Sequence, residues 1–435
     1  MNVHSLITRL RQSRLFADSL WALLGSAMGK GLSLLAGIAI ARLLGSELYG
    51  EYGTVKSTLL MIAVFSSLGL GYSATKFIAE SRTNGNDHRI VDTHRVATIV
   101  TLITSSIIAL AILLLADKVA ALLDAPHLAH TLRISSIAIV FNAINTTQTG
   151  ELAGFGAYRQ LAANNTWSGI FTFVTSIGLT LLYGFDGAII ALIISLLFNA
   201  ILNHRTLRRL LANYAESRHI NRAYMGEVVR FSIPIALQES LYTITNWGQI
   251  YILVTLADFS EYGISSAAHQ WMSVLLFIPG ALRNVALSHL SATNNDGERN
   301  RAILRRLMLV NFCSTFAPFV VIFLLSGWIA SWYGASFEGL QPVLNVCVLT
   351  AVVSSLSNVL TQEFMAHGRN WFLFWSRLLR DIGALTTTYI AICCFGHAAL
   401  AAAISVLVWQ SGYLIVLLFA QTTKLCGPRQ NKSDN

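Results

Sequence analysis

Charged side chains are scarce in this sequence. Asp, Glu, Lys and Arg together make up 12% of the 435 residues, whereas hydrophobic residues make up 54% and the mean hydropathy is +0.59. Soluble domains typically have about 25% charged residues, so this scarcity excludes soluble enzymes, fibrous proteins and disordered scaffolds. The apolar residues occur in repeated runs of about 20, the length of a helix that crosses a bilayer. We therefore predict an all-α polytopic membrane protein.

The sequence also lacks the signatures of catalysis and of metal binding. It has no Walker-type glycine loop, no HExxH and no GxSxG motif. The five cysteines show no paired spacing, and we expect neither a disulfide nor a metal site from them: Cys313, Cys347, Cys393, Cys394 and Cys426. We expect no catalytic residues and no cofactor. Movement of a cargo across the membrane without direct ATP hydrolysis is the interpretation that remains.

Apolar runs bounded by charged or turn residues predict twelve transmembrane helices. They cover residues 20–44, 54–75, 96–116, 131–151, 164–184, 187–203, 230–253, 263–288, 307–330, 340–361, 371–394 and 397–420. The first run is too long for the core of a signal peptide, so we expect it to remain as the first span. The loops on the extracytoplasmic side are short, the longest being about 117–130, which leaves no space there for a catalytic domain.

The basic residues predict the orientation of these helices. With the N-terminus in the cytoplasm, 22 of the 30 Lys and Arg residues lie on the cytoplasmic side. Lys118 and Arg133 lie on the opposite side, and the other six fall within spans or at their margins. The positive-inside rule therefore predicts that both termini are cytoplasmic. The net charge of +9 then reflects orientation, and we expect no nucleic-acid partner.

The longest polar connection divides the predicted spans into six plus six. We predict a basic cytoplasmic N-terminus (1–19), a six-helix bundle (20–203), a basic cytoplasmic linker (204–229), a second six-helix bundle (230–420) and a cytoplasmic tail (421–435). Both halves then have the same orientation, which permits a parallel internal repeat. At an offset of 212, residues 149–156 (TGELAGFG) align with residues 361–368 (TQEFMAHG), matching Thr, Glu and Gly.

Ionisable residues inside apolar spans are the best candidates for function, because each costs about 2.5 to 3.5 kcal/mol at a helix centre on insertion scales. Cations outnumber acids there, which favours a phosphate-bearing or acidic cargo over cationic drugs. The candidate substrate-binding cations are Lys30, Arg42, Lys56, Arg283, Arg377 and Arg380. The polar or coupling candidates are Glu239, Asp381, Asn142, Asn145, Gln238 and Asn358.

Structural explanations for the same residues stay open. Arg42 and Lys56 lie near the predicted outer interface, where a long side chain can extend toward the head groups. Arg377 has the spacing of an intrahelical ion pair with Asp381. Glu239 is either an internal partner for a cation such as Lys30 or a carrier of a coupling proton.

Several loose motifs, in the same order along the chain, resemble those of bacterial polysaccharide exporters. They are residues 38–52 (IAIARLLGSELYGEY), 69–80 (GLGYSATKFIAE), 150–159 (GELAGFGAYR), 231–234 (FSIP) and 277–279 (FIP). The family they resemble is the O-antigen flippase (Wzx-type) branch of the multidrug/oligosaccharidyl-lipid/polysaccharide (MOP) exporter superfamily.

The resemblance implies a fold, a cargo and a location. It implies a MATE-like fold with two six-helix bundles in the bacterial inner membrane. The implied cargo is undecaprenyl-diphosphate-linked oligosaccharide of an O-antigen, capsule or exopolysaccharide, flipped to the periplasmic leaflet by alternating access. Besides this glycan and the lipid bilayer, the resemblance points to a polysaccharide polymerase and a chain-length regulator as partners.

Three rival functions remain. A multidrug or cation antiporter of the same superfamily commonly relies on membrane-embedded acids, and the sequence has only Glu239 and Asp381 in its spans. A lipid II flippase resembles proteins with fourteen spans rather than twelve. A membrane-embedded polymerase or glycosyltransferase is expected to carry a large extracytoplasmic loop or a nucleotide-sugar domain, and the sequence has neither.

Overall fold

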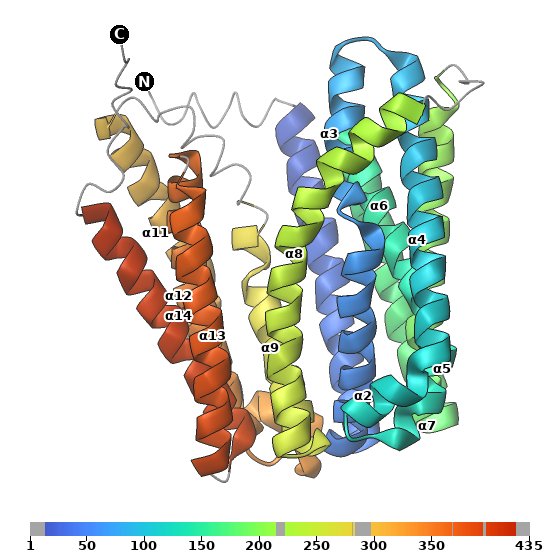
Figure 1. Ribbon diagram of the computed structural model, residues 1–435. Helices are drawn as coiled ribbons and strands as arrows, with labels where there is room; N and C mark the ends of the chain where they lie inside the picture. The colour runs from blue at the N-terminus through green and yellow to red at the C-terminus, as the bar shows by residue number, and fades with distance from the viewer. Residues whose placement is uncertain are drawn as a thin grey trace. The chain divides into compact units, whose positions relative to one another are not determined.

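The computed structural model describes residues 14–214, 222–280, 282, 297–367, 369–394 and 397–422 (Figure 1). Every regular element in this part of the chain is helical. The long helices are α2 (Arg14–Ser67), α3 (Leu70–Thr83), α4 (Asp87–Leu122), α6 (Ile137–Gly154), α7 (Tyr158–Leu211), α8 (Arg222–Leu256), α9 (Phe259–Leu275), α11 (Gly297–Tyr333), α12 (Leu340–Ala366), α13 (Asn370–Cys394) and α14 (Ala398–Thr422). The short elements are η1 (Pro126–Leu128), α5 (Ala129–Ser135) and η2 (Ala335–Phe337).

Six of the described helices are long and apolar enough to cross a membrane: those of 27–67, 87–122, 158–211, 298–333, 340–366 and 398–422. α2 and α7 each contain 54 residues, or about 80 Å at 1.5 Å per residue, far more than one bilayer crossing needs. Each is interrupted by a glycine with positive φ, at Gly45 (φ 77°) and Gly184 (φ 57°). The total of twelve crossings stays a prediction.

The contacts within α7 show that it is a helical hairpin. Its two halves pair through Asn164 and Asn203, with 2.9 Å between amide and carbonyl, and through the stacked rings of Phe171 and Phe198, whose centroids are 4.1 Å apart. These pairs nest around Gly184, so the halves run antiparallel. The predicted division of this region into spans at 164–184 and 187–203 matches that turn.

Two predicted spans are interrupted in the structure. The span predicted at 54–75 is broken between α2 and α3, where Leu68 and Gly69 have φ values of 47° and 69°. The span predicted at 263–288 begins within α9, which ends at Leu275. Leu275 lies four residues before Pro279, whose ring cannot accept the carbonyl of residue i−4 in a continuous helix. The sequence placed a kink at this proline.

The chain divides into two compact units. Unit 1 comprises residues 1–44 and 51–247, and unit 2 comprises residues 45–50 and 248–435. In unit 1, α6 packs against α3, α4 and α7. In unit 2, α12 packs against α9, α11, α13 and α14. The aligned segments 149–156 and 361–368 thus belong to the helix that makes the most neighbours in its own unit. The division predicted at 204–229 stays a prediction.

Close helix packing within each unit depends on small residues. In unit 1, a Cβ atom added to Gly150 of α6 would lie 2.0 Å from the backbone oxygen of Gly71 of α3. In unit 2, a Cβ atom added to Gly50 would lie 1.7 Å from the backbone oxygen of Phe259, at the start of α9. No side chain fits at either place, so these glycines let the backbones touch.

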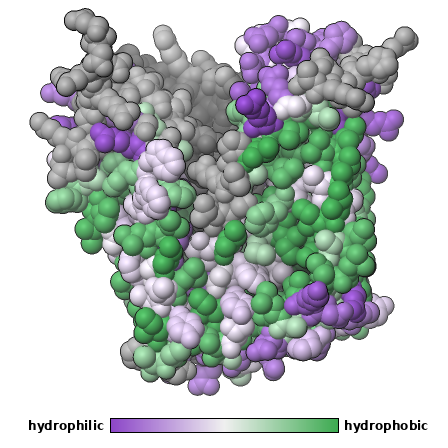
Figure 2. All heavy atoms as spheres, in the orientation of Figure 1, coloured by the Kyte–Doolittle hydropathy of each residue, from purple (hydrophilic) through white to green (hydrophobic). Residues whose placement is uncertain are grey.

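The surface of unit 1 has the pattern of a membrane protein. On its visible face, at the right of Figure 2, hydrophobic side chains form a band between hydrophilic ends. Exposed residues in this unit include Leu114 (68% exposed) and Leu182 (74% exposed). A water-facing surface would not carry such a band, whereas acyl chains would cover it.

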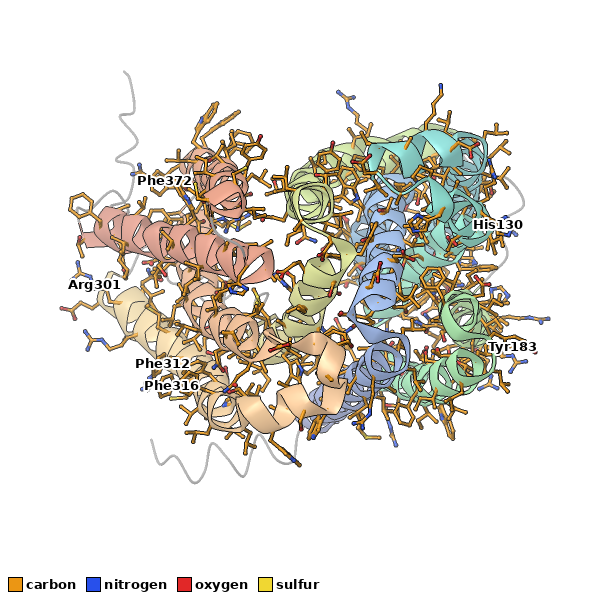
Figure 3. The ribbon with its side chains drawn as sticks, turned by 90° about the horizontal axis from the view of Figure 1, so that it is seen from below. His130, Tyr183, Arg301, Phe312, Phe316 and Phe372 are labelled. Atoms are coloured by element: carbon orange, nitrogen blue, oxygen red, sulfur yellow. The ribbon has the colours of Figure 1, made fainter. Side chains whose placement is uncertain are left out.

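Unit 2 carries a row of phenylalanine rings along α11. The rings of Phe312 and Phe316 are stacked with centroids 4.8 Å apart (Figure 3), and Phe319 and Phe323 continue the row at 5.7 Å spacings. Phe316 and Phe323 are exposed. This face of α11 is therefore suited to contact lipid.

Candidate substrate-binding site

Lys56 and Asn142 lie together at one small cavity in unit 1. The cavity has a volume of about 10 Å³, close to the space that one water molecule needs. Its lining is otherwise apolar and comprises Leu59 and Leu60 of α2, Ala138 of α6, and Leu192 and Leu196 of α7. The structure thus brings together one predicted cation and one predicted polar residue that are 86 positions apart.

Lys56 is half-buried, and its ammonium group lies 5.8 Å from the centroid of the Tyr52 ring. It has no ion-pair partner among the residues that the structure describes. A cation over an aromatic face keeps its charge available to an anion, because the ring contributes no formal negative charge. Lys56 is therefore the predicted cation whose surroundings best suit a phosphate or carboxylate ligand.

Lys30 and Arg42 are both on α2, and both side chains are exposed. The packing face beside Lys30 is made by glycines: a Cβ atom on Gly29 would lie 2.9 Å from the backbone oxygen of Asn165. The helix is thus fixed against α7 through Gly29, while the Lys30 side chain stays outside that contact. The predicted polar and small-residue face of this span serves, in part, to pack two helices.

Asn145 and Asn358 have different surroundings. Asn145 is buried on α6, and its amide donates a hydrogen bond of 2.9 Å to the backbone oxygen of Leu196 on α7. That bond gives Asn145 a structural role between two helices of unit 1. Asn358 is exposed on α12 of unit 2.

In unit 2, Arg380 is enclosed by a network of polar side chains. Its guanidinium is 2.6 Å from the carboxylate of Asp381, donates a 3.2 Å hydrogen bond to Oε1 of Gln410, and lies 5.0 Å from the centroid of the Tyr413 ring. Gln410 in turn donates a 2.6 Å hydrogen bond to Ser357. The network joins α12, α13 and α14.

This network corrects the ion pair that helical spacing favoured. Asp381 pairs with the adjacent Arg380 rather than with Arg377 four residues earlier. The reason is that Gln410 and Tyr413 of α14 hold the Arg380 guanidinium beside Asp381. Arg377 is half-buried and has no ion pair within the described part of the chain.

Three predicted site residues cannot be placed by their side chains. Arg283 lies outside the described residues. Gln238 and Glu239 are on α8, but their side chains are not among those that the structure describes. Their assigned roles stay predictions.

Sequence reasoning missed a buried acid in unit 1. Glu151 of α6 has a side chain that is 1% exposed, and its Oε2 atom is 3.0 Å from Nδ1 of His94 on α4. The repeat alignment contained the signal, since Glu151 is matched there by Glu363. Glu363 is also buried, on α12, and its Oε2 atom has no hydrogen-bond partner among the described residues.

Metal binding has no support in the described side chains. No group of three or more His, Cys, Asp and Glu residues could hold a metal ion in this part of the chain. Of the cysteines described, Cys313, Cys393 and Cys394 are exposed, Cys347 is buried, and all four are free thiols.

Comparison with known sequences gives consistent results. The sequence pattern of the family described as "Polysaccharide biosynthesis protein" matches residues 39–312. The "EPS I polysaccharide export inner membrane protein EpsE" of Ralstonia solanacearum is 26% identical over 203 residues, covering 46% of this chain and 45% of that protein. The chain therefore spans less than half the length of this relative. The "Succinoglycan biosynthesis transport protein ExoT" of Rhizobium meliloti is 22% identical over 384 residues, covering 83% of this chain and 71% of that protein.

Comparison with solved structures identifies the fold. An inward-facing multidrug resistance MATE transporter of the MOP superfamily superposes with a TM-score of 0.74 at 15% identity, covering 93% of this chain and 98% of that one. A MOP superfamily transporter from Pyrococcus furiosus, described by the reverse polarity of its binding pocket, superposes with a TM-score of 0.68 at 15% identity, covering 95% and 97%. The fold is that of the MATE transporters, as the sequence motifs implied.

Proposed function

The chain belongs to the family of polysaccharide biosynthesis proteins, and from that membership we propose that it is a transporter that exports polysaccharide units across a bacterial inner membrane. The proposed cargo is an oligosaccharide linked to undecaprenyl diphosphate. The chain would carry it from the cytoplasmic to the periplasmic leaflet by alternating access, with twelve spans and both termini in the cytoplasm. The match of the family pattern to residues 39–312 is the observation that carries the proposal.

The relatives and the fold support export rather than catalysis. EpsE is described as an export protein of the inner membrane and ExoT as a transport protein, and both descriptions concern polysaccharides. The fold covers 93% of the chain in the first comparison and belongs to transporters. The proposed partners are the lipid-linked glycan, the bilayer, and the polymerase and chain-length regulator that act on the exported unit.

Charge supports the lipid diphosphate as the proposed cargo. A diphosphate needs compensating positive charge when it leaves water, because unpaired charge in a low-dielectric region is costly. Lys56 offers an ammonium group without an acidic partner in the described residues, and Asn142 adds an amide beside the same cavity. Lys30 and Arg42 are exposed on α2 and are the next candidates. Arg380 is assigned to the fold instead, because Asp381 already neutralises it.

Drug export is the alternative that an experiment must exclude, because solved structures with the same fold include multidrug transporters. Purified protein would be reconstituted into liposomes that contain a fluorescent short-chain polyprenyl diphosphate carrying one or two sugars. We expect the protein to move labelled lipid between leaflets, measured as a growing fraction protected from a membrane-impermeant quencher. A cationic dye loaded into the same liposomes tests the antiporter. Dye movement without lipid movement would refute the proposal.

A cellular experiment addresses the same function. Bacterial strains that lack their own lipid-linked glycan flippase would receive the gene and be scored for surface polysaccharide. We expect restoration in at least one strain whose glycan matches the specificity of the chain. Substitution of Lys56 by Gln would serve as the matched loss-of-charge variant.

A further inference from the structure

A cluster of aromatic rings fixes the first turns of α8 onto α3 and α4 within unit 1. The Phe77 ring of α3 meets the rings of Tyr224 and Phe231 edge to face, with centroids 5.9 Å and 5.6 Å away. The Tyr224 hydroxyl is 2.6 Å from Oγ1 of Thr93 on α4. Phe77 and Tyr224 are buried, whereas Phe231 is 37% exposed. The cluster therefore presents one ring at the surface on a rigid base.

Basic side chains surround this ring. The Lys76 ammonium lies 4.0 Å from the centroid of the Phe231 ring and 5.1 Å from that of Phe77. Arg230 is the neighbour of Phe231 on α8 and is exposed. Lys76 and Arg230 form no ion pair with any described residue. Two positive charges beside an aromatic face are thus left without compensation by the protein.

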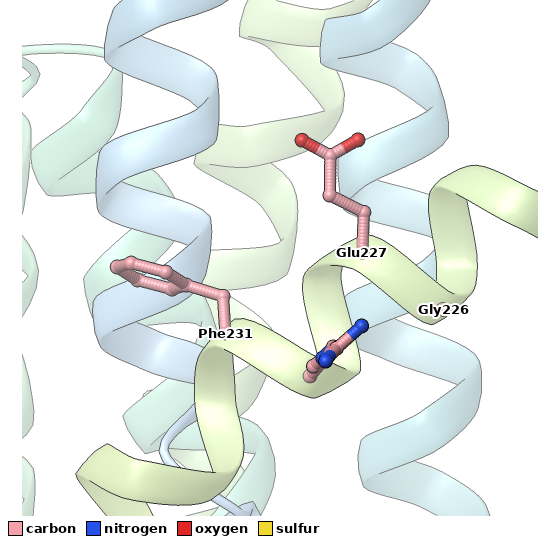
Figure 4. A pocket seen from close by; sticks show the side chains of 4 residues that line it. Gly226, Glu227 and Phe231 are labelled. Atoms are coloured by element: carbon pink, nitrogen blue, oxygen red, sulfur yellow. The ribbon is translucent and has the colours of Figure 1, made fainter.

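An open cavity of about 640 Å³ lies over the same turn of α8. Gly226, Glu227, Arg230 and Phe231 line it, and Figure 4 shows the Glu227 and Phe231 side chains extending from one side of the helix. The volume is within the range of small-molecule sites, about 300 to 1,000 Å³. The predicted start of span seven at residue 230 would place this cavity at the cytoplasmic boundary of the bilayer.

We propose that this cavity is a docking site for the diphosphate of a prenyl lipid, occupied before the lipid is moved. Arg230 and Lys76 would contact the phosphate oxygens, Phe231 would cover the first apolar carbons of the chain, and Gly226 leaves room beside the helix. This inference rests on the proposed function, because it names where the proposed cargo first binds. The site is separate from the cavity at Lys56 and uses none of its residues.

Glu227 gives the proposal a sign that can be measured. Its exposed carboxylate faces the cavity and repels a diphosphate, so removal of its charge strengthens binding of an anion. A site built for sugar hydroxyls would behave in the opposite way, because a carboxylate accepts hydrogen bonds from hydroxyl groups. A site that only anchors α8 at the bilayer surface would show no preference for the diphosphate.

The experiment measures equilibrium binding of radiolabelled farnesyl diphosphate to the full-length protein in detergent, without any transport step. We expect K76Q/R230Q to weaken binding about tenfold, since two charged hydrogen bonds are lost. E227Q should strengthen binding about threefold, because one repulsive charge is lost. The matched control is R205Q/R209Q, which removes two exposed charges from α7 of the same unit and should change the affinity less than twofold. Thermal melting confirms that each variant is folded.

Each outcome decides the proposal. It is overturned if K76Q/R230Q binds like the wild type, if the control loses as much affinity, or if E227Q weakens binding. Displacement of the probe by an equal concentration of phosphatidylglycerol would also overturn it, because the site would then hold ordinary bilayer lipids, and equal affinity for inorganic diphosphate would do the same. The leaflet-transfer assay tests the proposed function separately: binding with these signs but no lipid transfer would refute the function and leave the site.

Discussion

Unit 1 and unit 2 each hold a cation within a predicted span, but its surroundings differ. Lys56 in unit 1 lies over a tyrosine ring beside a small cavity, without an acidic partner in the described residues. Arg380 in unit 2 is held by Asp381, Gln410 and Tyr413. A cation in an apolar segment can therefore either await a ligand or cross-link helices, and only its neighbours distinguish the two cases.

The largest expected effect is loss of stability when the Arg380 pair is broken. The two side chains are 20% and 17% exposed, so D381N leaves a mostly buried guanidinium without compensation. We expect a loss of about 3 kcal/mol in the free energy of unfolding, measured by chemical denaturation in detergent. R377Q, on the same helix and without an ion pair in the described residues, should lose less than about 1 kcal/mol. Equal stability of D381N and the wild type would remove the contrast between the two units.

The second prediction compares the repeat-related acids. E151Q removes the charge from the hydrogen bond to His94, which should lower the free energy of unfolding by about 2 kcal/mol. E363Q should lower it by less than about 0.5 kcal/mol, because no hydrogen bond to that side chain is present in the described residues. The same denaturation measurement applies to both variants. If E363Q is the more damaging of the two, the assignment of Glu151 as the structural acid is wrong.

The third prediction concerns Lys56 and transport. K56Q should slow lipid transfer about tenfold, corresponding to about 1.4 kcal/mol, because the cargo loses one charged contact. Its melting temperature should stay within about 2 °C of the wild type, since no ion pair is broken. K118Q, at an exposed position near the far end of α4, is the control for loss of one positive charge and should transport normally.

The sequence predicted the helical elements better than their partners. Hydropathy located the turn at Gly184 and the interruption at Pro279, because an apolar run of a given length and a breaking residue are local properties. The break at Leu68 and Gly69 was missed because the run remains apolar through it. Local patterns do not show that the chain departs from helical φ there.

The surroundings of each cation could not be predicted from the sequence, because they depend on which helix faces which. Spacing favoured Arg377 as the partner of Asp381, but residues of α14 that are about 30 positions away hold Arg380 in that place. The proximity of Lys56 and Asn142 follows from the packing of α2 against α6 and α7 around one cavity. Hydropathy does not encode the rotation of one helix about its axis relative to another.

The most direct test compares K56Q with R380Q/D381N in the leaflet-transfer assay, at equal amounts of folded protein. The double variant removes the paired charges together, so no unpaired charge is left in the interior of unit 2. We predict that it keeps at least about half of the wild-type rate, whereas K56Q keeps about a tenth. Normal transfer by K56Q together with loss in R380Q/D381N would contradict the claim that unpaired cations serve the cargo and paired cations serve the fold.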